Sequence, residues 1–220
     1  MKKQTGNTRI LLVDDHNVVR EGLQALIEKE PDMKVVAAVD NGRDAISKAL
    51  ELAPDLVVMD IGMPGLNGID ATRQILAKRP QTRVLCLSVH REQRLVSAML
   101  EAGASGYLLK TGARKELIGA ARAVANGETY LSPPIAGDVV EHHVRGKGEG
   151  KGGAYGDLSE REREVLQLIA EGHHTKMIAN RLHISPKTVL AHRESAMSKL
   201  GIDSIAGLTR YALREGLAEL

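Results

Sequence analysis

Five short apolar runs, rich in β-branched residues, alternate in the first half of the chain with segments whose apolar residues recur at helical spacing. The apolar runs occupy residues 10–13, 35–39, 56–59, 84–89 and 106–109. The helical segments occupy residues 17–30, 42–52, 67–79, 91–103 and 113–127. Strands that alternate with helices predict a parallel sheet covered by helices on both faces. We therefore expect an α/β domain over residues 1–130.

Polar side chains follow or end four of these runs. Asp14 and Asp15 follow the first run, Asp60 follows the third, Ser88 lies at the end of the fourth, just before Val89, and Lys110 follows the fifth. An open parallel sheet binds ligands at the carboxyl ends of its strands. We therefore expect these five side chains to gather at one edge of the sheet.

Three carboxylates at one edge repel one another unless a cation lies among them. Mg²⁺ is a hard ion that prefers oxygen ligands, so it is the expected partner. Lys110 adds a second positive charge, and Ser88 adds a hydroxyl. Such a setting suits a phosphoryl group carried on Asp60. The alternative for any single position is a helix cap or a solvated loop residue, and only the joint arrangement favours a site.

The segments "ILLVDDHNVVREGL", "VVMDIGMPGLNGID", "CLSVH" and "GASGYLLK" resemble the receiver domain of two-component response regulators of the NarL/FixJ family. The resemblance covers about residues 8–128 and implies a flavodoxin-like (βα)5 fold. It implies that Asp60 accepts phosphate from a sensor histidine kinase. Mg²⁺ would be held by Asp14, Asp15, Asp60 and the carbonyl of Gly62. Ser88 and Lys110 would contact the phosphate, and Tyr107 would be the aromatic residue that reorients on activation.

The two halves of the chain are joined by a predicted linker over residues 131–156. A short helix is expected after Pro134, and His142 and His143 are interpreted as exposed residues on it rather than as a metal site. Residues 146–156 contain six glycines among eleven residues. A glycine-rich chain of this length is flexible and spans about 18 Å on average.

The last part of the chain, residues 157–220, predicts a small all-α domain of four helices. Ser159 and Glu162 form a capping-box pattern before the first helix. A short helix near residues 175–183 is followed almost at once by a longer one, which Ser185 and Pro186 begin and Gly201 ends. This order is typical of a helix-turn-helix. Val165, Leu166, Ile169, Ala170, Met177, Ile178, Leu182, Val189, Ala196 and Leu200 are expected to face its core.

Residues 173–200 carry five basic side chains and one acidic side chain, a local basic patch of the kind that binds DNA. Lys187, Thr188, Leu190, Ala191 and Glu194 are candidates for the DNA-facing surface of the longer helix. Leu190 and Ala191 suit thymine methyl groups, and Glu194 suits a cytosine amino group. The candidates for phosphate contacts are Lys176, Arg193 and Lys199. His192 is expected nearer the core, in a structural hydrogen bond.

The segment from Leu158 to Gly201 resembles the LuxR-type DNA-binding domain, over about residues 157–217. Together the two resemblances imply a transcriptional regulator that phosphate activates, that forms a homodimer when active, and that binds paired half-sites in double-stranded DNA.

Two alternatives stay open at this point. One is a Mg²⁺-dependent phosphatase, although Gly62 stands where such an enzyme needs a second acid. The other is an RNA-binding regulator, although RNA recognition usually stacks bases on aromatic residues, and Tyr211 is the aromatic residue in the last helical region. We expect no catalytic turnover as the function.

The remaining features of the chain predict its compartment. Cys86 lies in an apolar run and is interpreted as a buried small hydrophobe. The basic start "MKKQTGN" is not followed by an apolar run long enough for a signal peptide, and no segment is apolar enough to span a membrane. We therefore expect a cytoplasmic protein.

Overall fold

The computed structural model describes residues 7–144 and 155–218, without the side chains of 140–144. The chain divides into two compact units. One unit comprises Met1–Met63 with Asn67–Gly148, and the other comprises Pro64–Leu66 with Glu149–Leu220. Within the described residues, no helix combines the length and the apolar character that crossing a membrane requires.

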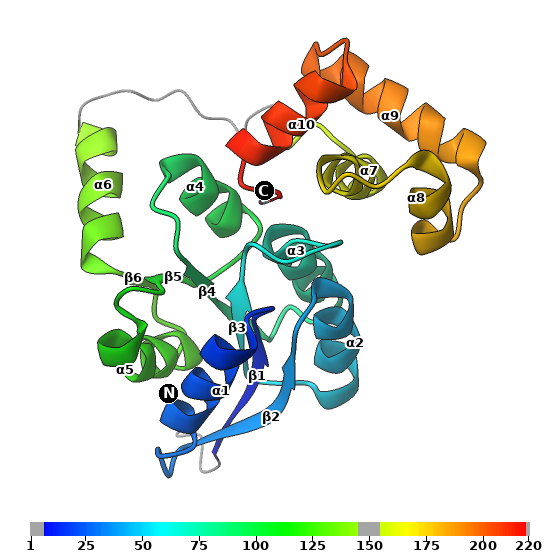
Figure 1. Cartoon of the computed structure of the whole chain (residues 1–220). Helices are drawn as coiled ribbons and strands as arrows, with labels where there is room; N and C mark the ends of the chain where they lie inside the picture. Colours follow the sequence, from blue (N-terminus) through cyan, green and yellow to red (C-terminus); the bar gives the residue numbers. More distant parts are fainter. Residues whose placement is uncertain (1–6, 145–154, 219–220) are drawn as a thin grey trace. The chain divides into compact units, whose positions relative to one another are not determined.

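The first unit is built on a parallel sheet (Figure 1). Its strands are β1 (Thr8–Val13), β2 (Met33–Val39), β3 (Leu56–Asp60), β4 (Arg83–Ser88), β5 (Gly106–Leu109) and β6 (Tyr130–Leu131). The strand order is β2-β1-β3-β4-β5-β6, and every pair is parallel. The chain runs from β1 outward to β2 and then returns past β1 to β3. The flavodoxin-like order of the first five strands is therefore confirmed.

Helices cover both faces of this sheet (Figure 1). They are α1 (Asn17–Ile27), α2 (Gly42–Leu52), α3 (Gly68–Lys78), α4 (Gln93–Glu101) and α5 (Ala113–Ala125). Alternate strand residues, such as Ile10, Leu12 and Val58, pack with α1 and α5 in one core. The residues between them are equally buried, so both faces of the sheet lie in apolar surroundings.

Cys86 in β4 is free and fully buried, as its place in an apolar run predicted. Burial raises the pKa of its thiol well above the ordinary value, with a smaller contribution from the Asp60 carboxylate. A thiol that stays protonated is a poor nucleophile.

The first unit continues past residue 130, where the sequence placed the start of a linker. Tyr130 and Leu131 form β6 beside β5, and α6 (Pro133–Val144) follows directly. Ile135 is fully buried, and Arg91 pairs with Asp138 of α6 at 3.3 Å. A two-residue strand has no periodicity to detect, so the sequence did not reveal this extension. The glycine-rich segment lies mainly at 145–154, outside the described residues, as do the side chains of His142 and His143.

The second unit contains α7 (Glu160–Ala170), α8 (Thr175–Leu182), α9 (Pro186–Leu200) and α10 (Ile205–Arg214). Ser159 and Glu162 form the predicted capping box. Gly172 and Gly201 have positive φ where α7 and α9 end. Tyr155, assigned to the linker by sequence, is buried in the core of this unit.

Two apolar clusters hold these helices together. One contains Leu166, Ala196 and Leu208, and the other contains Val165, Leu182 and Val189. Ile169, Ala170 and Leu200 pack against these clusters while only partly buried. Met177 departs from the expectation, because its side chain is 41 % exposed. In a helix of eight residues, neighbouring Ile178 and Leu182 already fill the inward face.

Candidate functional sites

The first candidate site lies where β1 and β3 end, at the point where the strand order reverses. Asp14 and Asp15 follow β1, and Asp60 is the last residue of β3. Ser88 is the last residue of β4, and Lys110 follows β5. Ser88 and Lys110 are joined by the backbone, since the Lys110 N–H donates to the Ser88 carbonyl at 2.8 Å. Parallel strands thus deliver all five side chains to the same edge of the sheet.

Lys110 holds the two buried carboxylates of this site. Its Nζ lies 2.7 Å from Asp60 Oδ2 and 2.9 Å from Asp14 Oδ2. Asp14 is fully buried, and Asp60 is 4 % exposed. The second Asp60 oxygen, Oδ1, accepts the Ile61 N–H at 2.8 Å. Each Asp60 oxygen is therefore oriented by one donor.

Burial and charge compete in the titration of this pair. Burial raises the pKa of Asp60 to about 6, even though the Lys110 ammonium acts to lower it. Burial acts to lower the pKa of Lys110, but the Asp60 and Asp14 carboxylates outweigh it and raise that pKa. A cation beside Asp60 would favour its ionised form.

The carboxylates have the donor set that a divalent cation needs. Asp14, Asp15, Asp60 and His16 each place one ligand atom within 4.8 Å of the others. Asp15 Oδ1 is buried, and it lies 2.8 Å from His16 Nδ1. Three carboxylates this close repel one another unless a cation lies among them, and carboxylate oxygens are ligands that Mg²⁺ prefers, so these residues fit a magnesium ion. Gly62 lies in the loop after β3 and is partly buried.

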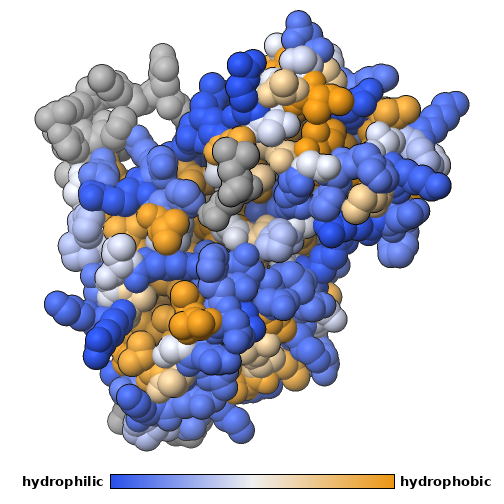
Figure 2. Space-filling model, in the orientation of Figure 1, coloured by the Kyte–Doolittle hydropathy of each residue, from blue (hydrophilic) through white to orange (hydrophobic). Residues whose placement is uncertain are grey.

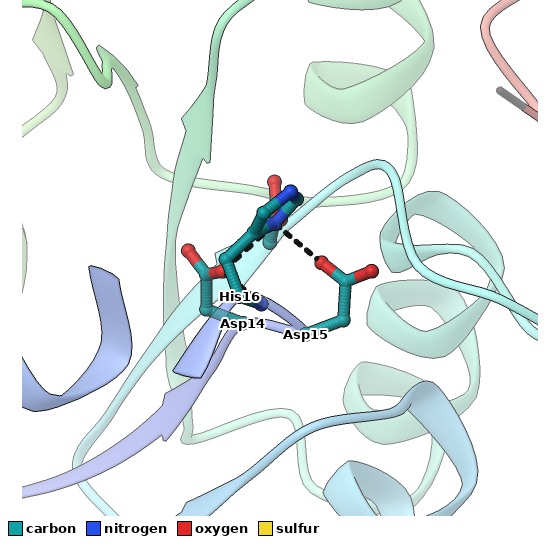
Figure 3. Close-up of side chains that lie close together, drawn as sticks. Asp14, Asp15 and His16 are labelled. Atoms are coloured by element: carbon teal, nitrogen blue, oxygen red, sulfur yellow. Dashed lines mark hydrogen bonds and ion pairs between the residues drawn. The ribbon is translucent and has the colours of Figure 1, made fainter. Parts of the chain in front are cut away.

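Three residues that the sequence analysis did not single out shape this site. Arg20 in α1 donates from its guanidinium to the Asp14 carbonyl at 2.6 Å, which supports the turn after β1. Gly68 begins α3 so close to β3 that a Cβ atom would lie 1.9 Å from the Asp60 carbonyl oxygen. His16 joins the carboxylate cluster (Figure 3). The glycine was visible in "LNGID", but its contact with β3 depends on tertiary packing.

The side chains of Ser88 and Tyr107 are connected through hydrogen bonds to the backbone of His90. The Ser88 hydroxyl accepts the His90 N–H at 3.1 Å, and the His90 carbonyl accepts the Tyr107 hydroxyl at 3.0 Å. Tyr107 is fully buried, and burial is the largest cause that raises the pKa of its phenol far above the ordinary value. A movement of Ser88 would therefore disturb the residue that holds the Tyr107 hydroxyl.

The second candidate site is the exposed face of α9. Ser185 caps this helix by accepting the Thr188 N–H at 3.1 Å, and the two hydroxyls lie 2.8 Å apart. Lys187, Leu190, Ala191 and Glu194 are exposed, while Val189 and Ala196 are buried on the opposite side, as predicted. Neither Lys187 nor Glu194 forms a hydrogen bond or ion pair with any described residue.

The three predicted phosphate contacts differ in their surroundings. Lys176 is exposed near the start of α8. Arg193 is half-buried, and its Nε has no partner among the described residues. Lys199 instead pairs with the buried Glu162 of α7 at 2.7 Å and donates to the Asp157 carbonyl at 3.2 Å. Its proposed phosphate contact therefore competes with an internal ion pair.

Glu162 is the acceptor that ties α7 to α9. Its side chain accepts the Ser195 hydroxyl at 2.6 Å, the Lys199 ammonium and the Ser159 N–H. Burial acts to raise the pKa of Glu162, but these donors outweigh it and lower the pKa to about 2. His192 is half-buried, and the hydrogen bond expected for it is not found with any described residue.

The surface of the molecule is mixed in character. Figure 2 shows a mainly hydrophilic face on which apolar side chains gather in separate patches. Among the described residues, the large apolar side chains that are clearly exposed are Val18, Leu50, Val89, Met177, Leu190 and Ile205. Three of these six, Met177, Leu190 and Ile205, lie in the second unit, although that unit buries most of its other apolar side chains.

Comparison with known proteins assigns each unit to a family model. Residues 10–122 match the response regulator receiver domain, and residues 157–212 match the bacterial regulatory proteins of the LuxR family. The oxygen regulatory protein NreC of Staphylococcus carnosus is 36 % identical over 96 % of this chain and 99 % of its own. The response regulator UvrY of Escherichia coli K12 is 36 % identical over 94 % of each chain.

A solved structure supports the same assignment. RcsB from Salmonella enterica serovar Typhimurium, bound to the promoter rprA in the presence of the phosphomimetic BeF3⁻, is 27 % identical to this chain. The likeness covers 94 % of this chain and 98 % of RcsB, with a TM-score of 0.62. It therefore spans both units of the molecule.

Proposed function

This chain belongs to the response regulators that combine a receiver domain with a LuxR-type DNA-binding domain, and on that basis we propose that phosphorylation of Asp60 controls its binding to DNA. The observation that carries this proposal is the arrangement around Asp60. A buried carboxylate at the β1–β3 switch point is held by a lysine and lies beside two more carboxylates.

The proposed chemistry is transfer of a phosphoryl group from a sensor histidine kinase. A carboxylate oxygen of Asp60 attacks phosphorus, and the bond from phosphorus to the histidine nitrogen breaks. A magnesium ion held by Asp14, Asp15, Asp60 and the Gly62 carbonyl would neutralise charge on the phosphoryl oxygens. Lys110, now paired with Asp60 at 2.7 Å, would pair with the phosphate instead.

Ser88 and Tyr107 would transmit the effect of phosphorylation to the rest of the receiver unit. In our proposal the Ser88 hydroxyl turns toward the phosphate and gives up the His90 N–H, which it accepts at 3.1 Å. The loop at His90 then shifts, and with it the carbonyl that holds the Tyr107 hydroxyl. Two alternative arrangements of this kind make a switch that phosphate can bias.

The second unit would bind double-stranded DNA as part of a homodimer. Lys187, Thr188, Leu190, Ala191 and Glu194 lie on or beside the exposed face of α9, which would enter the major groove. Lys176, Arg193 and Lys199 would contact phosphates and set the position of the helix. Two copies would occupy paired half-sites. This role requires no catalytic turnover.

The direct test is labelling of the full chain with a small phosphodonor and Mg²⁺. We expect one phosphate, mapped by mass spectrometry to Asp60, and no label on Asp60→Asn. Asp55→Asn is a matched control, because Asp55 is an acid just before β3 at the opposite end of the strand. Phosphate mapped to another residue, or equal labelling of Asp60→Asn, would overturn the assignment.

A further inference from the structure

We propose that His16 is an additional protein ligand of the divalent cation at the carboxylate cluster, and that it gives this site a preference for Mn²⁺ over Mg²⁺. The inference rests on the metal site of the proposed function, but it concerns a residue that neither the sequence analysis nor that function uses. It identifies the class of cation that the site takes most tightly, a first-row transition metal ion.

The imidazole contacts two of the proposed ligands, and dashed lines in Figure 3 join it to Asp14 and Asp15. His16 Nδ1 is 2.8 Å from Asp15 Oδ1 and 3.5 Å from Asp14 Oδ1. His16, Asp14, Asp15 and Asp60 each have a ligand atom within 4.8 Å of the others. A cation among the three carboxylates is therefore within reach of the ring nitrogen.

The carboxylate oxygens are divided between Lys110 and His16. The Lys110 ammonium lies against the Oδ2 atoms of Asp14 and Asp60, at 2.9 and 2.7 Å. His16 lies against the Oδ1 atoms of Asp14 and Asp15. A divalent cation is repelled by the ammonium and is therefore favoured on the side of Asp15, where the His16 imidazole is the neighbouring nitrogen ligand.

The backbone already fixes His16 in this position. Its N–H donates to Asp14 Oδ1 at 2.9 Å, and the residue immediately precedes α1. The side chain is 58 % exposed, so the ring is free to turn its nitrogen from Asp15 toward a bound cation. Ligation would thus require rotation of one side chain and no movement of the chain.

The type of ligand atom decides which cation binds more tightly because of His16. Mg²⁺ takes oxygen ligands in strict octahedral geometry and gives up water reluctantly. Imidazole nitrogen suits first-row transition metals, and Mn²⁺ also accepts the carboxylates that dominate this site. The ring should therefore add affinity for Mn²⁺ and little for Mg²⁺. In the alternative, the ring only contacts Asp15 and binds no cation. Its removal would then change the affinities for Mn²⁺ and Mg²⁺ by the same factor.

Electron paramagnetic resonance of Mn²⁺ tests this inference on the full chain at about pH 8, where an ordinary imidazole is neutral. The signal of unbound Mn²⁺ during a titration gives the affinity of the protein for Mn²⁺. Competition with added Mg²⁺ then gives the ratio of the affinities for the two ions. Pulsed measurements detect a ¹⁴N nucleus bound to Mn²⁺. His90→Ala is the matched control, because His90 lies at the same edge of the sheet, outside the cluster, and contacts Glu92.

We expect His16→Ala to lower the affinity for Mn²⁺ by about tenfold, the lower end of what supporting groups contribute at metal sites. Mg²⁺ affinity should change less than about twofold, and the ¹⁴N coupling should be present in the wild type and His90→Ala but absent in His16→Ala. Equal losses for both ions, or no ¹⁴N coupling in the wild type, would overturn the inference. Failure of the wild type to bind either ion would instead overturn the metal site itself.

Discussion

In the receiver unit, Asp60 is nearly enclosed, and the Lys110 ammonium and the Ile61 N–H hold its two oxygens. On α9, Lys187 and Glu194 are exposed and have no ionic partner among the described residues. In the first site, the two buried carboxylates, Asp14 and Asp60, are held by Lys110, which follows another strand. The second leaves Lys187 and Glu194 available for groups outside the chain, as contact with DNA requires, although Lys199 on the same helix pairs with Glu162.

This difference explains how much of each site the sequence could predict. The ends of parallel strands fix a side chain in space, so the positions of Asp14, Asp60 and Lys110 followed from the apolar runs alone. Capping signals at Ser159 and Ser185 likewise predicted where α7 and α9 begin. Strand ends and helix caps depend on residues close together in the sequence, so they could be predicted without knowing the tertiary structure.

Contacts between distant residues were not predictable in the same way. Glu162 and Lys199 are 37 positions apart, and nothing in either segment indicates that they pair. Gly68 meets the Asp60 carbonyl only because α3 packs directly against β3. His16 is a single histidine before a helix, a pattern that more often marks a surface residue. Tertiary packing decides the first two, whereas His16 contacts its sequence neighbours Asp14 and Asp15 through the local turn after β1.

The close packing of α3 against β3 beside the receiver site predicts the largest effect, at Gly68. A Cβ atom there would lie 1.9 Å from the Asp60 carbonyl oxygen, so Gly68→Ala must displace β3 or α3. We expect a loss of about 1–3 kcal/mol or more in the free energy of unfolding, together with slower labelling of Asp60. Hydrogen exchange of peptides from β3 and α3 measures the loss of stability.

Gly119 supplies the control for this change. It lies within α5, and a Cβ atom there would meet nothing within 4 Å. Gly119→Ala should stabilise the unit by about 0.5–1 kcal/mol, because glycine is unfavourable inside a helix. If the two substitutions have the same effect, close packing at Gly68 does not shape the site.

The ion pair of Glu162 predicts a pH-dependent effect in the second unit. Its pKa is about 2 in the folded unit and 4.5 in its ordinary state. A lowered pKa stabilises the fold above about pH 4.5, and this contribution is lost as the pH falls toward 2. At neutral pH, Glu162→Gln should cost about 1.5–3 kcal/mol, the worth of hydrogen bonds to a charged group.

Hydrogen exchange of α7 and α9 peptides over a pH series measures this contribution. The difference between the wild type and Glu162→Gln should shrink as the pH falls below about 4.5. Glu160→Gln is the control, since Glu160 is an exposed acid in the same turn. A difference that stays constant with pH would show that the charge of Glu162 is not what stabilises the unit.

On α9, exposed Leu190 predicts a smaller effect on base recognition. After selection of the preferred DNA site, thymine is replaced by uracil at each position, which removes only a methyl group. Loss of a contacted methyl should cost about 0.8 kcal/mol. Leu190→Ala should be insensitive to the same replacement, whereas Ile205→Ala, an exposed change on α10, should respond as the wild type does. Equal responses of all three proteins would mean that Leu190 does not face thymine.

Lys176 predicts the smallest effect, a uniform weakening of DNA binding. As an exposed cation near the start of α8, it is proposed to contact phosphate and not bases. Lys176→Ala should reduce the slope of affinity against salt concentration by about one and leave the selected sequence unchanged. A changed sequence preference would place Lys176 at a base instead.

The affinity of the full chain for its selected DNA, measured with and without a phosphodonor and Mg²⁺, tests most directly whether phosphate at Asp60 controls the second unit. We predict that phosphate raises the affinity of the wild type by about 5–150-fold, the usual range of coupling between sites. Asp60→Asn should show no rise. Lys110→Ala should accept phosphate but show no rise, while Lys115→Ala, an exposed change in α5, should behave as the wild type. A full rise in Asp60→Asn, or in phosphorylated Lys110→Ala, would contradict the proposal.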